Sequence, residues 1–239
     1  MSDRFFSPPL GNRPSVELTG AEAHHLMHVL RKNPGDQVSL FDGTGTEATA
    51  IIATTNRTSV ELSVLETTSA TNETRFRVDL ATAVPKGERF RWLVEKATEL
   101  GIHRLSPLLT TRGIVQPQRG KLEKMRQTVI AACKQSGRSR LMELAPLTRW
   151  ENFIANVSEG TEFFLADPRG EAAGQAAGNR ASDQPTLLAV GPEGGLTEME
   201  IELAVHVGAR LVSLGSHTLR VETAALAMAA LFVPRSADG

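Results

Sequence analysis

Short apolar and polar runs alternate along the first third of the chain and predict a mainly β structure. One helix interrupts them, because apolar residues recur at helical spacing from Gly20 to Lys32 and Asn33-Pro34-Gly35 follows. A polar, unpatterned stretch at 66–73 is typical of a linker. Strands are expected at 38–41, 47–53 and 59–65, with an Asp42-Gly43 turn after the first. The pattern predicts a small barrel or sheet that ends at about residue 72.

From residue 76 onward, apolar runs of strand length alternate with stretches of helical periodicity. The stretch 169–184, rich in glycine and alanine, is compatible with a weak helix or a loop. Strands are expected at 76–84, 105–109, 162–166, 186–190 and 211–214, and helices at 87–100, 118–136, 149–155, 197–207 and 222–232. Such alternation predicts an α/β domain with a mostly parallel sheet.

Composition narrows the class of protein. Hydrophobic residues make up 41% of the 239 and charged residues 22%, as in ordinary globular proteins. The longest clean apolar run, 224–233, has about half of the roughly 20 residues that cross a bilayer. Cys133 is the only cysteine, which excludes an internal disulfide and a cysteine-cluster zinc site. His24, His25 and His28 cannot all face one ion on a helix. With no export pattern at the N-terminus, we expect a cytoplasmic protein without a metal or a membrane.

Charge is distributed unevenly along the chain. The formal net charge is only -1, but residues 86–140 carry 13 Lys and Arg against 4 Glu. The chain before and after this segment is acidic in balance. Such asymmetry fits a surface that meets phosphates and equally fits solvated helix faces.

The segment after the expected strand 186–190 is the most informative. It reads Gly191-Pro-Glu-Gly-Gly195 and leads into a helix whose Thr197 and Glu200 have capping-box spacing. Glycines after a buried strand allow backbone amides to approach a ligand closely, although a tight connection without a ligand has the same pattern. Neither a dinucleotide fingerprint nor a Walker loop is present, which disfavours NAD and ATP.

A second polar loop, 215–220, lies between an expected strand and an expected helix. Arg220 gains nothing from the dipole of the helix that follows, so a ligand contact is the better interpretation. Glu222 lies in the first turn, where capping explains it more simply than catalysis. Arg138 follows the basic helix. It either stabilises the end of that helix or belongs to a functional site in the basic segment. No G-x-S-x-G elbow is present and Cys133 falls on an apolar helix face, which disfavours covalent hydrolysis.

Taken together, these motifs resemble the signature of the RsmE family of ribosomal RNA methyltransferases. The resemblance runs nearly end to end and includes Arg4-Phe-Phe6, His24-His25-Leu26, Asp42-Gly43, Lys96-Ala-Thr-Glu99, Gln135-Ser-Gly-Arg138, Gly191–Gly195 and Leu219-Arg-Val-Glu-Thr-Ala224. It implies a PUA-like β-barrel at 1–72 that binds RNA. It also implies a SPOUT methyltransferase domain at 73–239 with a C-terminal trefoil knot, and a homodimer.

The resemblance further implies transfer of a methyl group from S-adenosylmethionine to N3 of a specific uridine in 16S rRNA, within the small ribosomal subunit. Carried over to this chain, the cofactor site comprises Leu188, Val190, Gly191, Gly194, Gly195, Leu214, Gly215, Ser216 and Leu219.

Residue roles follow from this chemistry. A guanidinium stabilises the anion that uracil N3 must form, and we assign this catalytic role to Arg220. Arg138 is a second candidate, supplied either by the same subunit or by its partner. The general base is not identified. RNA phosphates are expected to contact Arg4, His25, Arg31, Lys121, Lys124 and Arg126. Two alternatives stay open: a SPOUT enzyme acting on another RNA such as tRNA, and a non-catalytic RNA-binding protein of ribosome assembly.

Overall fold

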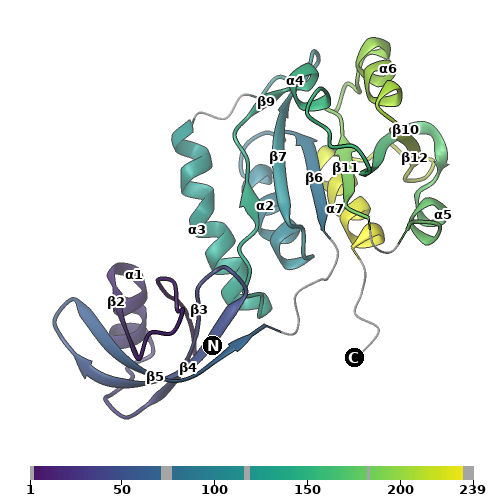
Figure 1. Ribbon diagram of the computed structural model, residues 1–239. Coiled ribbons are helices and arrows are strands. Elements are labelled where there is room, and N and C mark those ends of the chain that lie inside the picture. The colour runs from purple at the N-terminus through teal and green to yellow at the C-terminus, as the bar shows by residue number, and fades with distance from the viewer. Residues whose placement is uncertain (1–2, 71–76, 116–118, 182–183, 234–239) are drawn as a thin grey trace. The chain divides into compact units, whose positions relative to one another are not determined.

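The computed structural model describes residues 3–70, 77–115, 119–181 and 184–233, without the side chains of residues 119 and 121. The chain forms two compact units. The first is built from the chain up to residue 73 together with Ile130–Leu141, and the second from 74–129 and 142–239. Figure 1 labels the elements of both. None of the described helices is both long and apolar enough to cross a membrane.

The first unit is built on a five-stranded sheet with the order β1-β3-β4-β5-β2. Register shifts in the β4–β5 ladder bend the two long strands, which allows the sheet to curve around its own core. The core contains Phe5, Leu26 and Leu40, none of them exposed. The strands are β1 (Arg4–Phe6), β2 (Ser15–Thr19), β3 (Gln37–Phe41), β4 (Thr46–Thr55) and β5 (Ser59–Ser69). The predicted β structure is confirmed, while β1 and β2 were not predicted.

Two predicted boundaries in this unit are wrong. The expected linker at 66–73 begins too early, because β5 pairs with β4 as far as Ser69; residues 71–73 lie outside the described part. The expected helix 20–32 is shorter and irregular, with α1 (Gly20–His24) followed by a π-helical turn at His25–Val29. Arg31 then adopts a φ of +53°, which ends the helical conformation.

The predicted Asp42-Gly43 turn is confirmed in detail. Oδ1 of Asp42 accepts the backbone amide of Thr44 at 2.9 Å, and Gly43 has a φ of +81°. Leu141, from the second segment of this unit, donates its amide to the carbonyl of Gly43 at 3.0 Å. An added Cβ at Gly43 would lie 2.8 Å from Cγ of Leu141, so glycine is required for this close approach.

The second unit contains one parallel sheet with the order β12-β10-β11-β6-β7-β8, and β9 also pairs with β7. All its ladders are parallel, so the carboxyl ends of its strands share one edge. The strands are β6 (Val78–Ala83), β7 (Arg104–Leu109), β8 (Glu143–Leu144), β9 (Thr148–Arg149), β10 (Glu162–Ala172), β11 (Thr186–Val190) and β12 (Arg210–Ser213). The predicted parallel α/β domain is confirmed.

Helices cover this sheet and fix its loops. Helix α7 packs on β6, β11 and α2, while α4 packs on β7 and α6 (Figure 1). The short α5 lies against α7, β10 and β12, which favours the helical interpretation of the glycine- and alanine-rich stretch. The helices are α2 (Arg89–Glu99), α3 (Arg119–Ser136), α4 (Trp150–Ile154), α5 (Ala173–Gly178), α6 (Glu198–His206) and α7 (Val221–Phe232). The trefoil knot and the domain boundary at 72/73 stay predictions.

Candidate cofactor site

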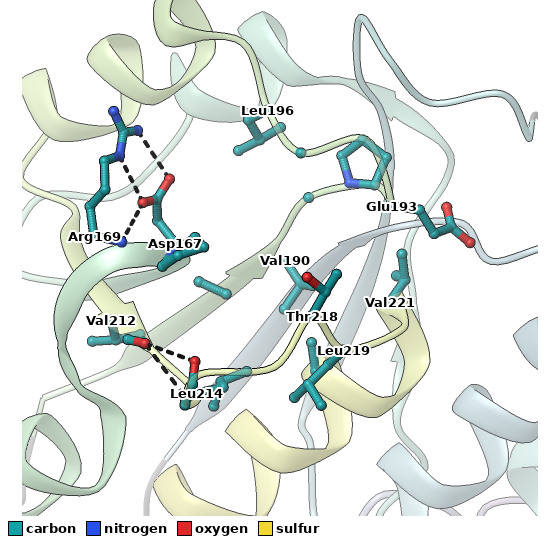
Figure 2. Close-up of a pocket in the computed structure, with 18 of the residues that line it drawn as sticks. Asp167, Arg169, Val190, Glu193, Leu196, Val212, Leu214, Thr218, Leu219 and Val221 are labelled. Carbon is teal, nitrogen blue, oxygen red and sulfur yellow. Dashed lines mark hydrogen bonds and ion pairs between the residues drawn. The ribbon is translucent and has the colours of Figure 1, made fainter.

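An irregular segment within β10 and the loops that follow β11 and β12 meet at one edge of the second unit's sheet. They line a cavity of about 570 Å³, a volume typical of small-molecule sites. In open parallel sheets this edge is where ligands bind. Figure 2 shows Asp167, Val190, Leu196, Thr218 and Leu219 around this space. The lining comprises residues 166–169, 190–193, 195, 196, 198, 201, 212–219, 221 and 224.

The loop after β11 borders the cavity mainly with its backbone. An added Cβ at Gly191 would stand 2.9 Å from Cγ of Leu196, a side chain that lines the same cavity. Gly195 has a φ of +70°, which residues with a Cβ rarely adopt. Both glycines are therefore required by the conformation, as the sequence pattern indicated.

Thr197 and Glu200 close this loop by capping α6. The amide of Glu200 donates to Thr197 Oγ1 at 3.2 Å, and Glu200 Oε2 accepts the amide of Thr197 at 2.7 Å. The predicted capping box is confirmed. It fixes the point at which the glycine loop ends and α6 begins.

Glu200 also connects this loop to the loop after β7. Its Oε1 accepts the amide of Thr111 at 2.8 Å, and its backbone carbonyl accepts Nε1 of Trp150 at 2.9 Å. Only 2% of Glu200 is exposed. Burial by itself raises the pKa of this carboxyl, but the hydrogen bonds from Thr111 and Thr197 outweigh burial and hold its pKa below the usual value. The charged form of Glu200 is therefore part of the fold.

Arg112 reinforces the same connection from the surface. Its Nη1 donates to the carbonyl of Gly194 at 2.9 Å and to that of Leu196 at 3.5 Å. These two carbonyls lie on either side of Gly195, so one guanidinium nitrogen spans the end of the glycine loop. Sequence reasoning did not find this role, since it depends on contacts 82 and 84 positions apart.

The loop after β12 supplies the opposite wall. Leu214, Ser216 and Leu219 line the cavity. Gly215 has a φ of +112°, and its amide donates to Ser213 Oγ at 3.4 Å. This loop therefore also depends on a glycine at its first turn.

Asp167 and Arg169 form a third wall that the sequence did not predict. The β10–β12 register breaks between Ala166 and Glu171, so the intervening residues leave the ladder and reach the cavity. Asp167 Oδ1 accepts both the amide and Nε of Arg169 at 2.9 Å (Figure 2). Arg169 Nη1 also lies 3.0 Å from Glu198 Oε2. Hydrogen bonding from Arg169 lowers the pKa of Asp167. An Asp-Pro-Arg turn directly after an apolar strand was the available signal.

Most of the predicted cofactor residues line this cavity. Leu188 lies within β11 and is fully buried, and Gly194 faces Arg112, so neither of these two is a lining residue. Those that line the cavity are Val190, Gly191, Gly195, Leu214, Gly215, Ser216 and Leu219.

The two predicted catalytic arginines have different settings. Arg220 is exposed and precedes α7, between the lining residues Leu219 and Val221. Arg138 belongs to the first unit and is 9% exposed. The catalytic role of each stays a prediction.

Glu222 differs from the expected helix cap. Only 5% of it is exposed, its Oε2 has no hydrogen-bond partner among the described residues, and Oε1 lies 3.5 Å from Nη1 of Arg89 on α2. No described backbone amide donates to it, so capping through a hydrogen bond is wrong for this residue. Its charge still lies in the first turn, where the helix dipole favours an acid.

The predicted RNA-binding residues divide into engaged and exposed groups. Arg4 is 12% exposed; it pairs with Glu47 at 2.8 Å and donates to the carbonyl of Arg138 and to Ser139 Oγ. Both Nη atoms of Arg4 are therefore engaged inside the first unit, which disfavours a phosphate contact, but the RNA-binding role of Arg4 stays a prediction. His25 is half-buried, and its Nδ1 lies 3.4 Å from Lys134 Nζ. Arg31, Lys124 and Arg126 are exposed, and the side chain of Lys121 lies outside the described part.

No group of three or more His, Cys, Asp or Glu that could hold a metal ion occurs among the described residues.

Comparisons with known proteins identify the family to which this chain belongs. Residues 72–233 match the family model of an RNA methyltransferase domain, and residues 18–65 match that of an RNA methyltransferase PUA domain. A PUA-like domain followed by a parallel α/β domain with this cavity defines an RNA methyltransferase. The chain belongs to the ribosomal RNA small subunit methyltransferase E family.

Individual relatives and structures agree with this assignment. Ribosomal RNA small subunit methyltransferase E of Bacillus subtilis is 31% identical over 89% of this chain and 87% of its own length. The protein of that name from Synechocystis sp. is 37% identical over 88% of this chain and 70% of its own length. The Neisseria gonorrhoeae enzyme bound to S-adenosyl methionine has a TM-score of 0.87, 30% identity and 96% coverage of both chains. A Legionella pneumophila methyltransferase solved with SAM has a TM-score of 0.85, 28% identity and 97% coverage of both.

Proposed function

We propose that this protein transfers a methyl group from S-adenosylmethionine to N3 of a specific uridine of 16S rRNA in the small ribosomal subunit. The observation that carries the proposal is the glycine-dependent cavity between the irregular segment of β10 and the loops after β11 and β12. Two relatives of the same fold were solved with this cofactor, and the curated relatives are named as ribosomal RNA small subunit methyltransferases. The subunit and the nucleotide are inferred from that family.

The residues of the cavity fit S-adenosylmethionine. Val190, Leu196 and Leu219 offer apolar surface suited to an adenine ring. Gly191 lets Leu196 pack closely against the glycine loop, because any Cβ there would displace Leu196 from its place in the cavity wall. The carboxylate of Asp167 is suited to a hydroxyl or an ammonium group. When bound, the cofactor supplies a methyl group that its sulfonium has already activated.

The remaining chemistry concerns the uracil. N3–H is a weak acid, and loss of its proton spreads negative charge onto O2 and O4. A guanidinium held nearby stabilises that charge and favours the reactive anion. We assign this role to Arg220, whose two chain neighbours line the cavity, with Arg138 of the partner subunit as the second candidate in a homodimer. The buried Glu222 is held next to Arg89, and we assign it no proton transfer.

RNA binding in this proposal uses exposed cations. Arg31 in the first unit, and Lys124 and Arg126 on α3, are placed to attract phosphates, and we retain His25 and Lys121 in the set. The target base has to leave its stack to reach the cavity. A ribosomal substrate also places the enzyme in the cytoplasm.

The experiment is transfer of a labelled methyl group to small ribosomal subunits that lack the modification. Label in the rRNA is expected. If a parallel reaction with tRNA became labelled and the subunits did not, the substrate would be tRNA. If S-adenosylmethionine neither bound in calorimetry nor labelled any RNA, the non-catalytic assembly protein would be the better description.

Arg220→Ala tests the catalytic assignment. We expect kcat to fall by about a hundredfold or more, with affinity for S-adenosylmethionine nearly unchanged, and Arg220→Lys to be intermediate. Arg210→Ala is the matched control, because Arg210 lies at the amino end of β12 and pairs with Glu171 at 2.6 Å. Normal turnover by Arg220→Ala would remove Arg220 from the mechanism.

A further inference from the structure

Arg112 occupies an unusual position at the carboxyl edge of the sheet. It follows β7, it is exposed, and its Nη1 is committed to the carbonyls of Gly194 and Leu196. Two hydrogen bonds from one nitrogen fix the plane of the guanidinium. The side chain is therefore exposed yet oriented.

The rest of this guanidinium is not used within the protein. An arginine carries five N–H donors, and among the described residues no group accepts from Nε or Nη2 of Arg112. No described carboxylate forms an ion pair with it, including the exposed Glu193 in the same glycine loop. Nη1 is thus the inner edge of the guanidinium, fixed to the glycine loop, while Nε and Nη2 form an outer edge that is free to bind a ligand.

The charge of the surroundings indicates what this fork binds. Lys86 is exposed and Arg89 is partly exposed after β6, the strand next to β7, and the exposed Arg220 follows β12 at the same edge. The carboxylate of Glu222 next to Arg89 is almost fully buried. Glu88 and Glu193 are also exposed in the loops after β6 and β11, but neither forms an ion pair with Arg112 among the described residues. An oriented guanidinium without a carboxylate partner matches the paired oxygens of a phosphate.

We propose that Arg112 binds a phosphate of the substrate RNA with its outer edge while its inner edge holds the cofactor loop. The inference rests on the proposed function and adds a substrate-binding residue to it. One side chain then links the RNA backbone to Gly194 and Leu196. Bound RNA would restrict Arg112 further and thereby stabilise the loop that borders the cavity.

Two substitutions of Arg112 separate its contact with the RNA phosphate from its contact with the loop carbonyls. Arg112→Gln keeps a donor for the loop carbonyls and loses the charge, whereas Arg112→Lys keeps the charge and loses the planar fork. Arg104→Gln is the matched control, because it removes the same charge from the amino end of the same strand, where Arg104 lies 3.6 Å from Glu143.

The measurement is the salt dependence of binding to a uridine-containing RNA stem-loop, together with calorimetry of S-adenosylmethionine. For Arg112→Gln we expect the slope of log affinity against log salt to shrink by about one phosphate contact, with cofactor binding largely kept. For Arg112→Lys we expect the slope to be kept and cofactor binding to weaken. Arg104→Gln should match the wild type in both.

A wild-type RNA affinity and salt slope in Arg112→Gln would overturn the proposal and leave Arg112 as a loop clamp only. The RNA measurement needs no cofactor and no turnover. Failure of wild-type methyl transfer would therefore count against the proposed function, while the comparison of slopes would still decide the role of Arg112.

Discussion

The carboxylate of Glu200 accepts the backbone amide of Thr111 at 2.8 Å, across 89 positions of sequence. The same carboxylate caps its own helix through Thr197. A single buried side chain therefore ties the loop after β7 to the end of the glycine loop. This bond holds one wall of the cavity in place before any ligand arrives.

Replacing Glu200 with Gln should destabilise the protein, most strongly near neutral pH. The amide cannot accept the amides of both Thr111 and Thr197, and an unmet buried donor costs about 1–3 kcal/mol. The pKa of Glu200 is lowered in the folded protein, so its stabilising effect is present above the usual pKa of a glutamate and is lost as pH falls through the lowered value. Urea unfolding from neutral to acidic pH should show the two proteins converging in acid. A gap in unfolding free energy that did not change with pH would contradict this account.

Gly191→Ala should weaken binding of S-adenosylmethionine at least about tenfold, which is about 1.4 kcal/mol. The new Cβ would stand 2.9 Å from Cγ of Leu196, so this lining side chain has to shift and the shape of the cavity changes. Calorimetry measures the affinity. Adding Leu196→Ala removes the clashing atom and should restore part of it, whereas equal affinity in Gly191→Ala and the wild type would contradict the close approach.

Arg4→Met should lower stability and leave the salt dependence of RNA binding unchanged. Its guanidinium bonds to Glu47, Ser139 and the carbonyl of Arg138, and it lies 4.7 Å from the ring centre of Phe41. Losing these bonds should cost about 1–3 kcal/mol in the free energy of unfolding. Salt titrations of RNA binding supply the second readout.

Arg31→Asn is the contrasting variant, because Arg31 is exposed and asparagine tolerates its φ of +53°. It should reduce the slope of log RNA affinity against log salt by about one and leave the free energy of unfolding nearly unchanged. A reduced slope in Arg4→Met would restore Arg4 as a phosphate contact.

Arg89 and Glu222 should be energetically coupled. Removing Arg89 leaves a nearly buried carboxylate without its cation, so Arg89→Ala should destabilise by about 1–3 kcal/mol. Glu222→Gln leaves no unpaired charge. In the Glu222→Gln background, Arg89→Ala should therefore lower the free energy of unfolding very little. A double-mutant cycle of unfolding free energies measures this difference, and additive effects would show that the 3.5 Å contact contributes nothing.

Local patterns were sufficient for most of the second unit. Strand β11 spans Thr186–Val190 as predicted, because a short apolar run between polar breaks identifies a buried strand. The capping box of Thr197 and Glu200 and the turn at Asp42 were equally readable, since each is complete within a few residues.

Features that depend on distant contacts were not readable. Strand β1 has only three residues and forms by pairing with β3, so its own sequence carries no periodic signal. Arg4 has the charge expected of an RNA contact, yet it pairs with Glu47 and donates to Ser139 only once the chain folds. The role of Arg112 likewise depends on carbonyls that lie 82 and 84 positions away.

The most direct test of the central claim is the identity of the methylated nucleoside. Small ribosomal subunits lacking the modification would be incubated with the protein and isotopically labelled S-adenosylmethionine, and the extracted 16S rRNA digested to nucleosides for mass spectrometry. Our account predicts the label in 3-methyluridine, with Gly191→Ala reducing its amount. Label in any other nucleoside, or none in rRNA under conditions where the cofactor binds, would contradict it.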